Sequence, residues 1–207
     1  MKKLDASFYN RNDVTEIARQ LLGKLLITQI DGVQTSGRIV ETEAYAGEVD
    51  RASHAYGGRR TNRTEVMFGR PGVAYVYLCY GIHHLFNVVT NRENVPHAVL
   101  VRALEPIDGL VDMLIRTKKA KADASLTRGP GNVSRAMGIH TSHSGTDLYG
   151  DRIYIADDGF ILPEEAIIAS PRIGVDYAGP DALLPYRFFV EGNMYVSGKR
   201  TVQTPKK

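Results

Sequence analysis

The sequence predicts a single α+β domain built around an antiparallel sheet. Its 207 residues, 43% of them hydrophobic, are enough to bury one full core. An amphipathic helical run comes first, and short strand-like runs joined by glycine-containing turns follow it. No internal repeat, low-complexity tract or linker divides the chain, so we assign residues 1–207 to one domain.

The first predicted element is a helix over residues 13–22. Asp13 followed by Glu16 is a capping-box pattern, and Gly23 closes the run. The apolar residues between them recur at helical spacing: Val14, Ile17, Ala18, Leu21 and Leu22. This stripe indicates a helix with one face on the core.

Two predicted hairpins supply most of the sheet. Residues 25–30 and 33–44 alternate like strands and flank Asp31-Gly32, a type I′ turn signal. A long basic loop, marked by glycines up to Gly72, precedes the second hairpin, formed by residues 73–80 and 83–90 with its turn near Gly81.

The second half is predicted to alternate short elements. The apolar residues 98–104 indicate a buried strand, and residues 108–121 a helix. Gly129-Pro130-Gly131 introduces a short helix that ends near Gly138. Short strands should follow, with turns at Asp158-Gly159, Gly179-Pro180 and Gly198.

The charge is unevenly distributed although the net charge is only +3. Residues 51–70 hold five arginines and one acid, residues 116–135 six basic residues and one acid, and residues 147–165 six acids and one base. The pattern suggests a two-faced molecule whose basic side could meet phosphates. Either basic segment alone fits a solvated surface loop equally well.

Composition and motifs exclude several classes of protein. The one cysteine, Cys79, can form neither an internal disulfide nor a multi-thiolate zinc site, and His83 and His84 point to opposite sides of a strand. Metalloprotease, phosphate-loop and serine-hydrolase motifs are absent. With no apolar run of ~18 residues and no signal core, we expect a soluble cytoplasmic protein with no metal, cofactor or membrane contact.

Two carboxylates on one predicted strand are candidates for chemistry. Alternation over residues 38–44 places Ile39, Glu41 and Glu43 on one face. Carboxylates on a mostly apolar strand are costly unless paired, and Arg38 and Arg102 are the candidate partners. A solvated strand edge is the alternative.

Aromatic residues and one histidine offer a second set of candidates. Tyr75, Tyr77 and Tyr80 lead to the turn of the second hairpin, where ordinary sheet packing would explain any one of them. Tyr80, near the tip and beside basic loops, is placed to wedge between bases or to stack on one. His54 by itself is equally a structural histidine.

In order and spacing these residues resemble the alkyladenine (3-methyladenine) DNA glycosylase family of bacteria and vertebrates. The matching stretches are residues 38–45 (RIVETEAY), His54 with Gly57-Gly58-Arg59, Met67-Phe68, Pro71-Gly72, Tyr75-Val76-Tyr77, Tyr80-Gly81, Asn87, residues 101–106 (VRALEP), Gly129-Pro130 and residues 172–175 (RIGV). The resemblance covers nearly the whole chain, to about Val196, and is more specific than any single motif.

The resemblance implies a compact fold with a curved antiparallel sheet flanked by helices and a protruding hairpin that enters the DNA minor groove. It implies that Glu43 is the general base and that Arg102 and the backbone carbonyl of Ile173 hold its water. The flipped base would lie between Tyr45 on one side and His54 with Tyr77 on the other. Asn87 would test the base edge, and Tyr80 would fill the gap in the duplex. Glu41 receives no role and is interpreted as structural.

The implied activity is that of a monofunctional bacterial repair enzyme. It would flip alkylated or deaminated purines, of the 3-methyladenine, 7-methylguanine, hypoxanthine and etheno-adenine class, out of duplex DNA and hydrolyse the N-glycosidic bond. We expect a monomer, associated with the nucleoid through DNA. One alternative is a non-catalytic binder of distorted DNA. Another is a hydrolase of free nucleosides that uses Glu41 and Glu43 as a pair, although neighbours on one strand face do not flank a bond.

Overall fold

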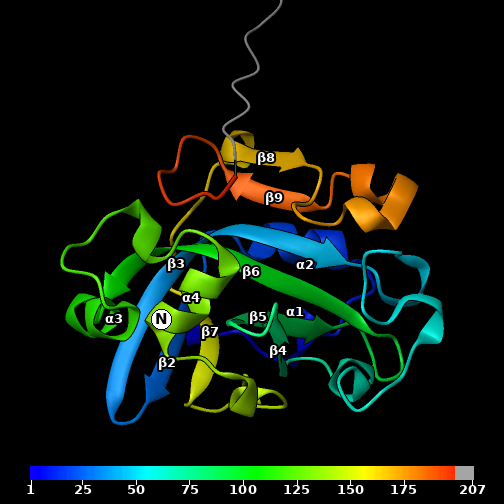
Figure 1. Ribbon diagram of the computed structural model, residues 1–207, viewed down its shortest axis with the longest axis horizontal. Coiled ribbons are helices and arrows are strands. Elements are labelled where there is room, and N and C mark those ends of the chain that lie inside the picture. Colours follow the sequence, from blue (N-terminus) through cyan, green and yellow to red (C-terminus); the bar gives the residue numbers. More distant parts are fainter. Residues whose placement is uncertain (199–207) are drawn as a thin grey trace, which may run out of the picture.

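The computed structural model describes residues 1–198, so residues 199–207 of the predicted domain lie outside the described part. Within it, an antiparallel sheet runs in the order β1 (Lys2–Lys3), β7 (Ile153–Asp157), β2 (Leu25–Ile30), β3 (Val33–Tyr45), β6 (His97–Asp108), β5 (His83–Thr90) and β4 (Ala74–Cys79). β9 (Arg187–Val190) pairs with β3 and with β8 (Ile167–Ser170). The sheet curls around helices (Figure 1), which confirms the predicted α+β class and its curved antiparallel sheet.

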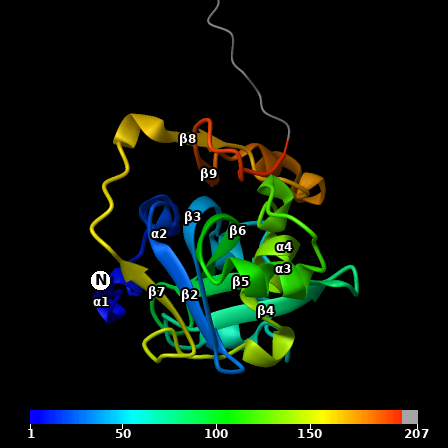
Figure 2. The ribbon, with the colours of Figure 1, turned by 90° about the vertical axis from the view of Figure 1, so that its left-hand side faces the viewer.

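Both hairpins form where the sequence predicts them. Asp31 and Gly32 have positive φ angles of 54° and 76°, as a type I′ turn requires, and they join β2 to β3. β4 pairs with β5 from Ala74↔Val88 to Cys79↔His83. The turn of this second hairpin lies at the right-hand edge of the molecule in Figure 2.

The register of the β3–β6 pair shifts at three places, and two of these irregularities are adjacent. Ile39 lies opposite Leu104 and Glu41 opposite Ala103, so Val40 is an extra residue on β3. Thr42 then lies opposite Val101, which makes Arg102 an extra residue on β6. Such bulges turn side chains and are frequent beside functional sites.

The bulge overturns one prediction about strand faces. Ile39 packs in the main core with Ala44, whereas Glu41 and Glu43 point away from that core toward Arg102. The prediction that Ile39 shares a face with the two glutamates is therefore wrong, because strict alternation fails where one strand gains a residue.

The helices form where capping residues begin and end them. α2 (Val14–Leu21) follows a short α1 (Ala6–Tyr9), and the Asp13 carboxylate accepts hydrogen bonds from the backbone N–H groups of Thr15 and Glu16. α4 (Pro130–Met137) begins with proline and ends at Gly138, which has a φ of 70°. α3 (Leu110–Thr117) is shorter than predicted because β6 extends to Asp108 and Lys118 turns left-handed, with a φ of 57°.

Two large apolar cores, with two small clusters beside them, stabilise these layers in the described residues. α2 and α4 pack on the sheet through a main core that includes Ile17, Leu21, Phe86, Val133 and Met137. The long loop after β3 covers a second core of Ala55, Met67, Phe68, Val73, Tyr75, Val89 and Ala98. This second core fixes the loop beside the β4–β5 hairpin.

Short 3₁₀ helices fill most of the connections. They are η1 (Gly47–Val49), η2 (Tyr56–Gly58), η3 (Glu65–Phe68), η4 (Ala124–Leu126), η5 (Thr141–His143), η6 (Glu164–Ala166) and η7 (Asp176–Leu183). The predicted turn at Gly179-Pro180 falls inside η7, where Gly179 has a φ of 59°. Among residues 1–198, no helix has the length and apolar character needed to span a membrane.

Candidate active site

A cavity of about 890 Å³ opens between the β4–β5 hairpin, the long loop after β3, strand β6 and the segment that carries Ile173. Seven of the eight predicted site residues line it: Tyr45, His54, Tyr77, Tyr80, Asn87, Arg102 and Ile173. The eighth, Glu43, is fully buried directly behind this wall, in contact with three of the lining residues. The structure therefore brings the predicted set together.

Glu43 is held by two hydrogen bonds and one ion pair, from three parts of the chain. Its Oε1 accepts a hydrogen bond of 2.8 Å from the backbone N–H of Ile173. Its Oε2 accepts one of 2.8 Å from the Tyr45 hydroxyl and lies 3.2 Å from Nη1 of Arg102. A buried carboxylate needs such compensation to keep its charge. A carboxylate offers about four lone-pair directions, so these neighbours leave room for a further donor.

Tyr45 is a donor that stays protonated. Burial, and then the neighbouring charge of Glu43, raises the pKa of Tyr45 well above its usual value. Burial works against the charge of Arg102, but the carboxylates of Glu43 and Glu41 outweigh it and hold the pKa of Arg102 above its usual value. Across the physiological pH range Tyr45 thus remains a hydrogen-bond donor to Glu43, and Arg102 remains a cation beside it.

Glu41 joins the site to the C-terminal segment. Its Oε1 accepts hydrogen bonds from Nε of Arg102 at 3.0 Å, Nε of Arg187 at 2.7 Å and Oγ of Ser197 at 2.9 Å, and its Oε2 accepts one from the N–H of Ser197 at 2.7 Å. Glu41 is fully buried, and both arginines are at most 8% exposed. Two carboxylates and two guanidinium groups therefore balance their charges in one cluster.

Of the two arginines predicted to pair with the glutamates, one does so. Arg102 contacts Glu41 and Glu43, as expected. Arg38 does not; it forms an ion pair with Asp158 at 2.8 Å. Arg38 precedes the bulge at Val40, which places it on the part of β3 beside β2.

A buried ion pair that the sequence analysis missed positions Ile173. Nη2 of Arg172 donates a 2.8 Å hydrogen bond to Oδ1 of Asp50, and Nη1 donates one of 2.9 Å to the carbonyl of Ala44. The guanidinium also lies 4.8 Å from the Tyr45 ring centroid. These contacts tie the Ile173 segment to the end of β3. The arginine of the RIGV stretch was the available signal, but nothing in the sequence pointed to Asp50.

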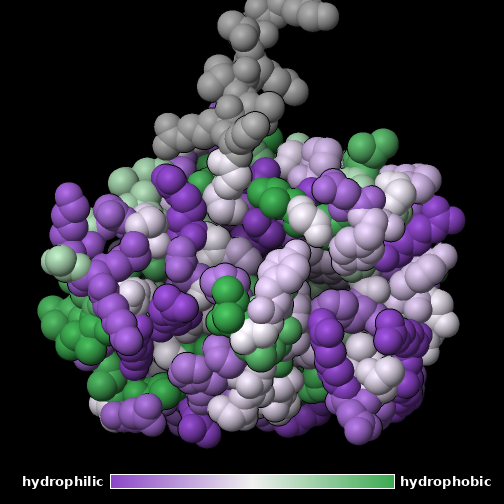
Figure 3. Space-filling model, in the orientation of Figure 1, coloured by the Kyte–Doolittle hydropathy of each residue, from purple (hydrophilic) through white to green (hydrophobic). Residues whose placement is uncertain are grey.

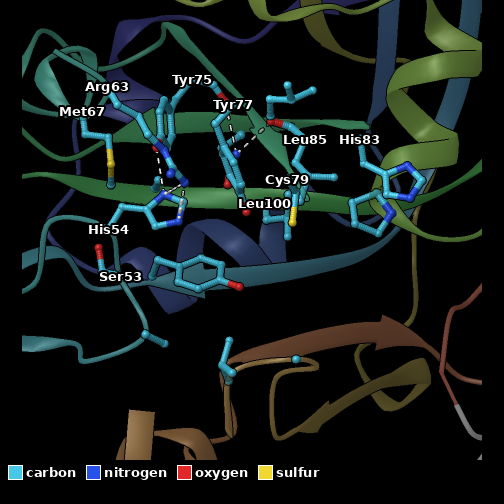
Figure 4. A pocket seen from close by; sticks show the side chains of 18 of the residues that line it. Ser53, His54, Arg63, Met67, Tyr75, Tyr77, Cys79, His83, Leu85 and Leu100 are labelled. Atoms are coloured by element: carbon cyan, nitrogen blue, oxygen red, sulfur yellow. Dashed lines mark hydrogen bonds between the residues drawn. The ribbon is translucent and has the colours of Figure 1, made fainter. Parts of the chain in front are cut away.

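His54 lies in a cluster of aromatic side chains (Figure 4). Its ring centroid is 4.6 Å from that of Tyr77 at an interplanar angle of 82°, and its Nδ1 is 2.8 Å from the Tyr75 hydroxyl. Burial, with Arg63 and Arg59 nearby, lowers the pKa of His54 to about 4. His54 is therefore neutral at pH 7. Its contacts with Tyr75, Tyr77 and Arg63 place it in the cavity wall.

Tyr80 is displayed at the hairpin turn. Its side chain is 89% exposed, and its φ of 50° is rare for a bulky residue. Gly81 follows with a φ of 73°. A strained backbone that presents a large ring to solvent indicates a contact surface. Asn87, by contrast, is 3% exposed and donates to the carbonyls of Tyr75 and Leu85 at 3.1 and 3.2 Å.

The charges are arranged differently from the predicted two-faced molecule. Arg51, Arg59 and Arg63 line the cavity. Most acids of residues 147–165, by contrast, are neutralised by basic side chains. The ion pairs that do this are Lys3–Asp151, Arg19–Glu164, Lys24–Asp157, Arg38–Asp158 and Arg70–Asp147. Hydrophilic side chains gather on both sides of the face seen in Figure 3. The acidic half of the predicted two-faced molecule is thus a set of ion pairs.

Two histidines outside the cavity, His84 and His140, lie side by side. His84 and His140 pack edge to face with their ring centroids 4.9 Å apart, and the N–H of Thr141 donates to Nδ1 of His84. No group of three or more potential ligands from His, Cys, Asp and Glu converges in the described part of the chain.

Comparison with known proteins identifies the family. A family profile described as methylpurine-DNA glycosylase (MPG) matches residues 7–194. The chain is 47% identical over 201 residues to a protein of Bacillus cereus (strain B4264), with 93% of this chain and 98% of that relative covered. It is 46% identical over 206 residues to a protein of Desulfitobacterium hafniense (strain Y51), with 96% and 100% covered. Both relatives carry a provisional name, 3-methyladenine DNA glycosylase.

These matches confirm the family predicted from the motifs. They extend over the strand of Glu41 and Glu43, the β4–β5 hairpin and the Ile173 segment, which together build the cavity. The chain therefore belongs to the methylpurine-DNA glycosylase family and is a DNA glycosylase.

Proposed function

We propose that this enzyme flips damaged purines of the 3-methyladenine type out of duplex DNA and hydrolyses their N-glycosidic bond with a water activated by Glu43. The other members of the proposed substrate class are 7-methylguanine, hypoxanthine and etheno-adenine. The observation that carries the proposal is the buried Glu43 carboxylate, held by two hydrogen bonds and an ion pair at the wall of an aromatic cavity. The product would be an abasic site.

Base flipping follows from the geometry of the substrate. The glycosidic bond of a stacked purine is inaccessible, so the base must leave the helix and the hole must be filled. A cavity of about 890 Å³ accommodates a purine nucleotide. We assign Tyr45 to one side of the base, His54 and Tyr77 to the other, Asn87 to the base edge, and the exposed Tyr80 to the hole.

The proposed chemistry assigns each donor around Glu43 a part. Departure of the base creates an oxocarbenium-like sugar, which a carboxylate stabilises while it accepts a proton from the attacking water. Tyr45 and the Ile173 N–H orient the carboxylate, and Arg102, which reaches both Glu43 and the cavity, helps to hold the water. The Ile173 carbonyl is assigned to the same water.

His54 suits the recognition of a base better than proton donation. With its pKa lowered to about 4, the imidazole is neutral at pH 7, and the one N–H that it keeps is too weak an acid to protonate a neutral leaving base. Its neutral ring and Tyr77 instead offer aromatic surface, which attracts the positive charge of an alkylated purine.

A duplex with a single hypoxanthine tests the proposal against both alternatives. Incubation followed by alkali should break the labelled strand at the lesion, and free inosine should stay intact. A DNA-binding module that does no chemistry would bind the lesion without alkali-sensitive breakage. A hydrolase of free nucleosides would release hypoxanthine from inosine but leave the duplex uncut.

Replacing Tyr80 with alanine should weaken capture of the flipped state. Loss of a stacking ring at the hairpin turn removes about 1–3 kcal/mol of stabilisation. A fluorescent base analogue beside the lesion would report the fraction flipped at equilibrium. Tyr80→Phe keeps the ring and should flip like the wild type. Undiminished flipping by Tyr80→Ala would remove Tyr80 from the proposed mechanism.

A further inference from the structure

Arg63 brings a positive charge into the aromatic wall of the cavity. Its Nη2 lies 2.8 Å from Nε2 of His54, and its guanidinium carbon lies 4.9 Å from the centroid of the Tyr77 ring. Figure 4 shows its side chain running past Tyr75 to His54. These are two of the rings to which we assign the flipped base.

The charge of Arg63 is not cancelled by a carboxylate. In residues 1–198, no Asp or Glu lies within ion-pair distance of Arg63. Arg60 of the same loop, by contrast, pairs with Glu65 at 2.7 Å and bonds to Asn94 at 3.1 Å. The cavity therefore experiences the charge of Arg63 and not that of Arg60.

Arg63 also contacts both ring nitrogens of His54. Its Nη2 lies 2.8 Å from Nε2 and 3.2 Å from Nδ1, and Nδ1 lies 2.8 Å from the Tyr75 hydroxyl. Arg63 contributes to the lowered pKa of His54. The free enzyme thus holds the Arg63 guanidinium against the rings of Tyr77 and His54, and His54 is neutral.

We propose that Arg63 determines how the enzyme ranks cationic against neutral damaged purines. A guanidinium on the Tyr77 ring and a base alkylated at N3 or N7 compete for the same electron-rich surface, and their like charges repel. A neutral base such as hypoxanthine experiences no such repulsion. Arg63 accordingly disfavours cationic lesions relative to neutral ones. This inference rests on the proposed function, because it needs the flipped base to enter this cavity.

The test compares two lesions in otherwise identical duplexes, one with a single 7-methylguanine and one with a single hypoxanthine. Single-turnover rate constants isolate the steps up to bond cleavage. For Arg63→Gln, the ratio of the 7-methylguanine rate to the hypoxanthine rate should rise about 3- to 10-fold over the wild-type ratio. Arg63→Lys keeps the charge and should stay near the wild-type ratio. Arg60→Gln is the matched loop control and should leave the ratio unchanged.

A second readout does not depend on activity. Titration of His54 by NMR should give a higher pKa in Arg63→Gln than in the wild type, because one of the charges that lower it is gone. Arg63 is exposed, so its replacement should leave the fold intact.

The outcomes separate the two proposals. If the wild type cleaves both lesions but Arg63→Gln keeps the wild-type ratio, or shifts it toward hypoxanthine, the role of Arg63 is wrong while the proposed function stands. An equal loss of cleavage rate on both lesions would indicate that Arg63 contacts the DNA backbone, and it would also overturn the inference. If neither the wild type nor Arg60→Gln cleaves either lesion, the proposed function fails, and the inference fails with it.

Discussion

Glu43→Gln is expected to reduce base excision about 10²- to 10⁴-fold, the usual contribution of general base catalysis. Glutamine keeps the size of the side chain but cannot take a proton from water or stabilise a cationic sugar as a carboxylate does. Single-turnover excision from a hypoxanthine duplex would measure the loss, and a binding assay on the same duplex should show nearly unchanged affinity. The Ile173 N–H can still donate to the amide oxygen.

Tyr45→Phe is the matched control for that experiment. It removes one hydrogen bond to Glu43 and keeps the ring in the cavity wall, so it should reduce excision far less than Glu43→Gln. Near wild-type excision by Glu43→Gln would show that another group activates the water.

Glu41→Gln is expected to lower the free energy of unfolding by about 3–5 kcal/mol, the usual cost of breaking a buried ion pair by removing one charge. Glu41 accepts hydrogen bonds from Arg102, Arg187 and Ser197 and is fully buried. Its replacement leaves two buried guanidinium groups with Glu43 as the only carboxylate of the cluster. Urea denaturation would measure the loss, and excision at a temperature where the variant is folded should fall less than in Glu43→Gln.

An exposed pair and a double variant serve as controls for Glu41. Glu65→Gln breaks the exposed ion pair with Arg60 and should leave the free energy of unfolding nearly unchanged, because water and salt screen an exposed pair. Combining Glu41→Gln with Arg187→Gln should cost less than the sum of the two single changes, because the first already removes the partner of the second. A loss below 1 kcal/mol for Glu41→Gln would contradict the charge balance that we describe.

The sequence alone predicted features that depend on a few adjacent residues. Asp13 caps α2, Asp31-Gly32 forms the first hairpin turn, and Pro130 and Gly138 bound α4. In each case the local backbone preference and the nearest hydrogen bonds decide the outcome. The motifs also identified the family, because many short stretches recur in the same order along nearly the whole chain.

Only the tertiary structure decided how the charges around the site are arranged. The extra residues Val40 and Arg102 on paired strands turn Arg102 toward both glutamates, and a bulge depends on the partner strand as well as on its own sequence. Arg187 lies 146 positions from Glu41, and the Ile173 N–H lies 130 positions from Glu43. Such contacts arise when distant segments pack, because burying a charge requires whichever opposite charge or donor the fold places beside it.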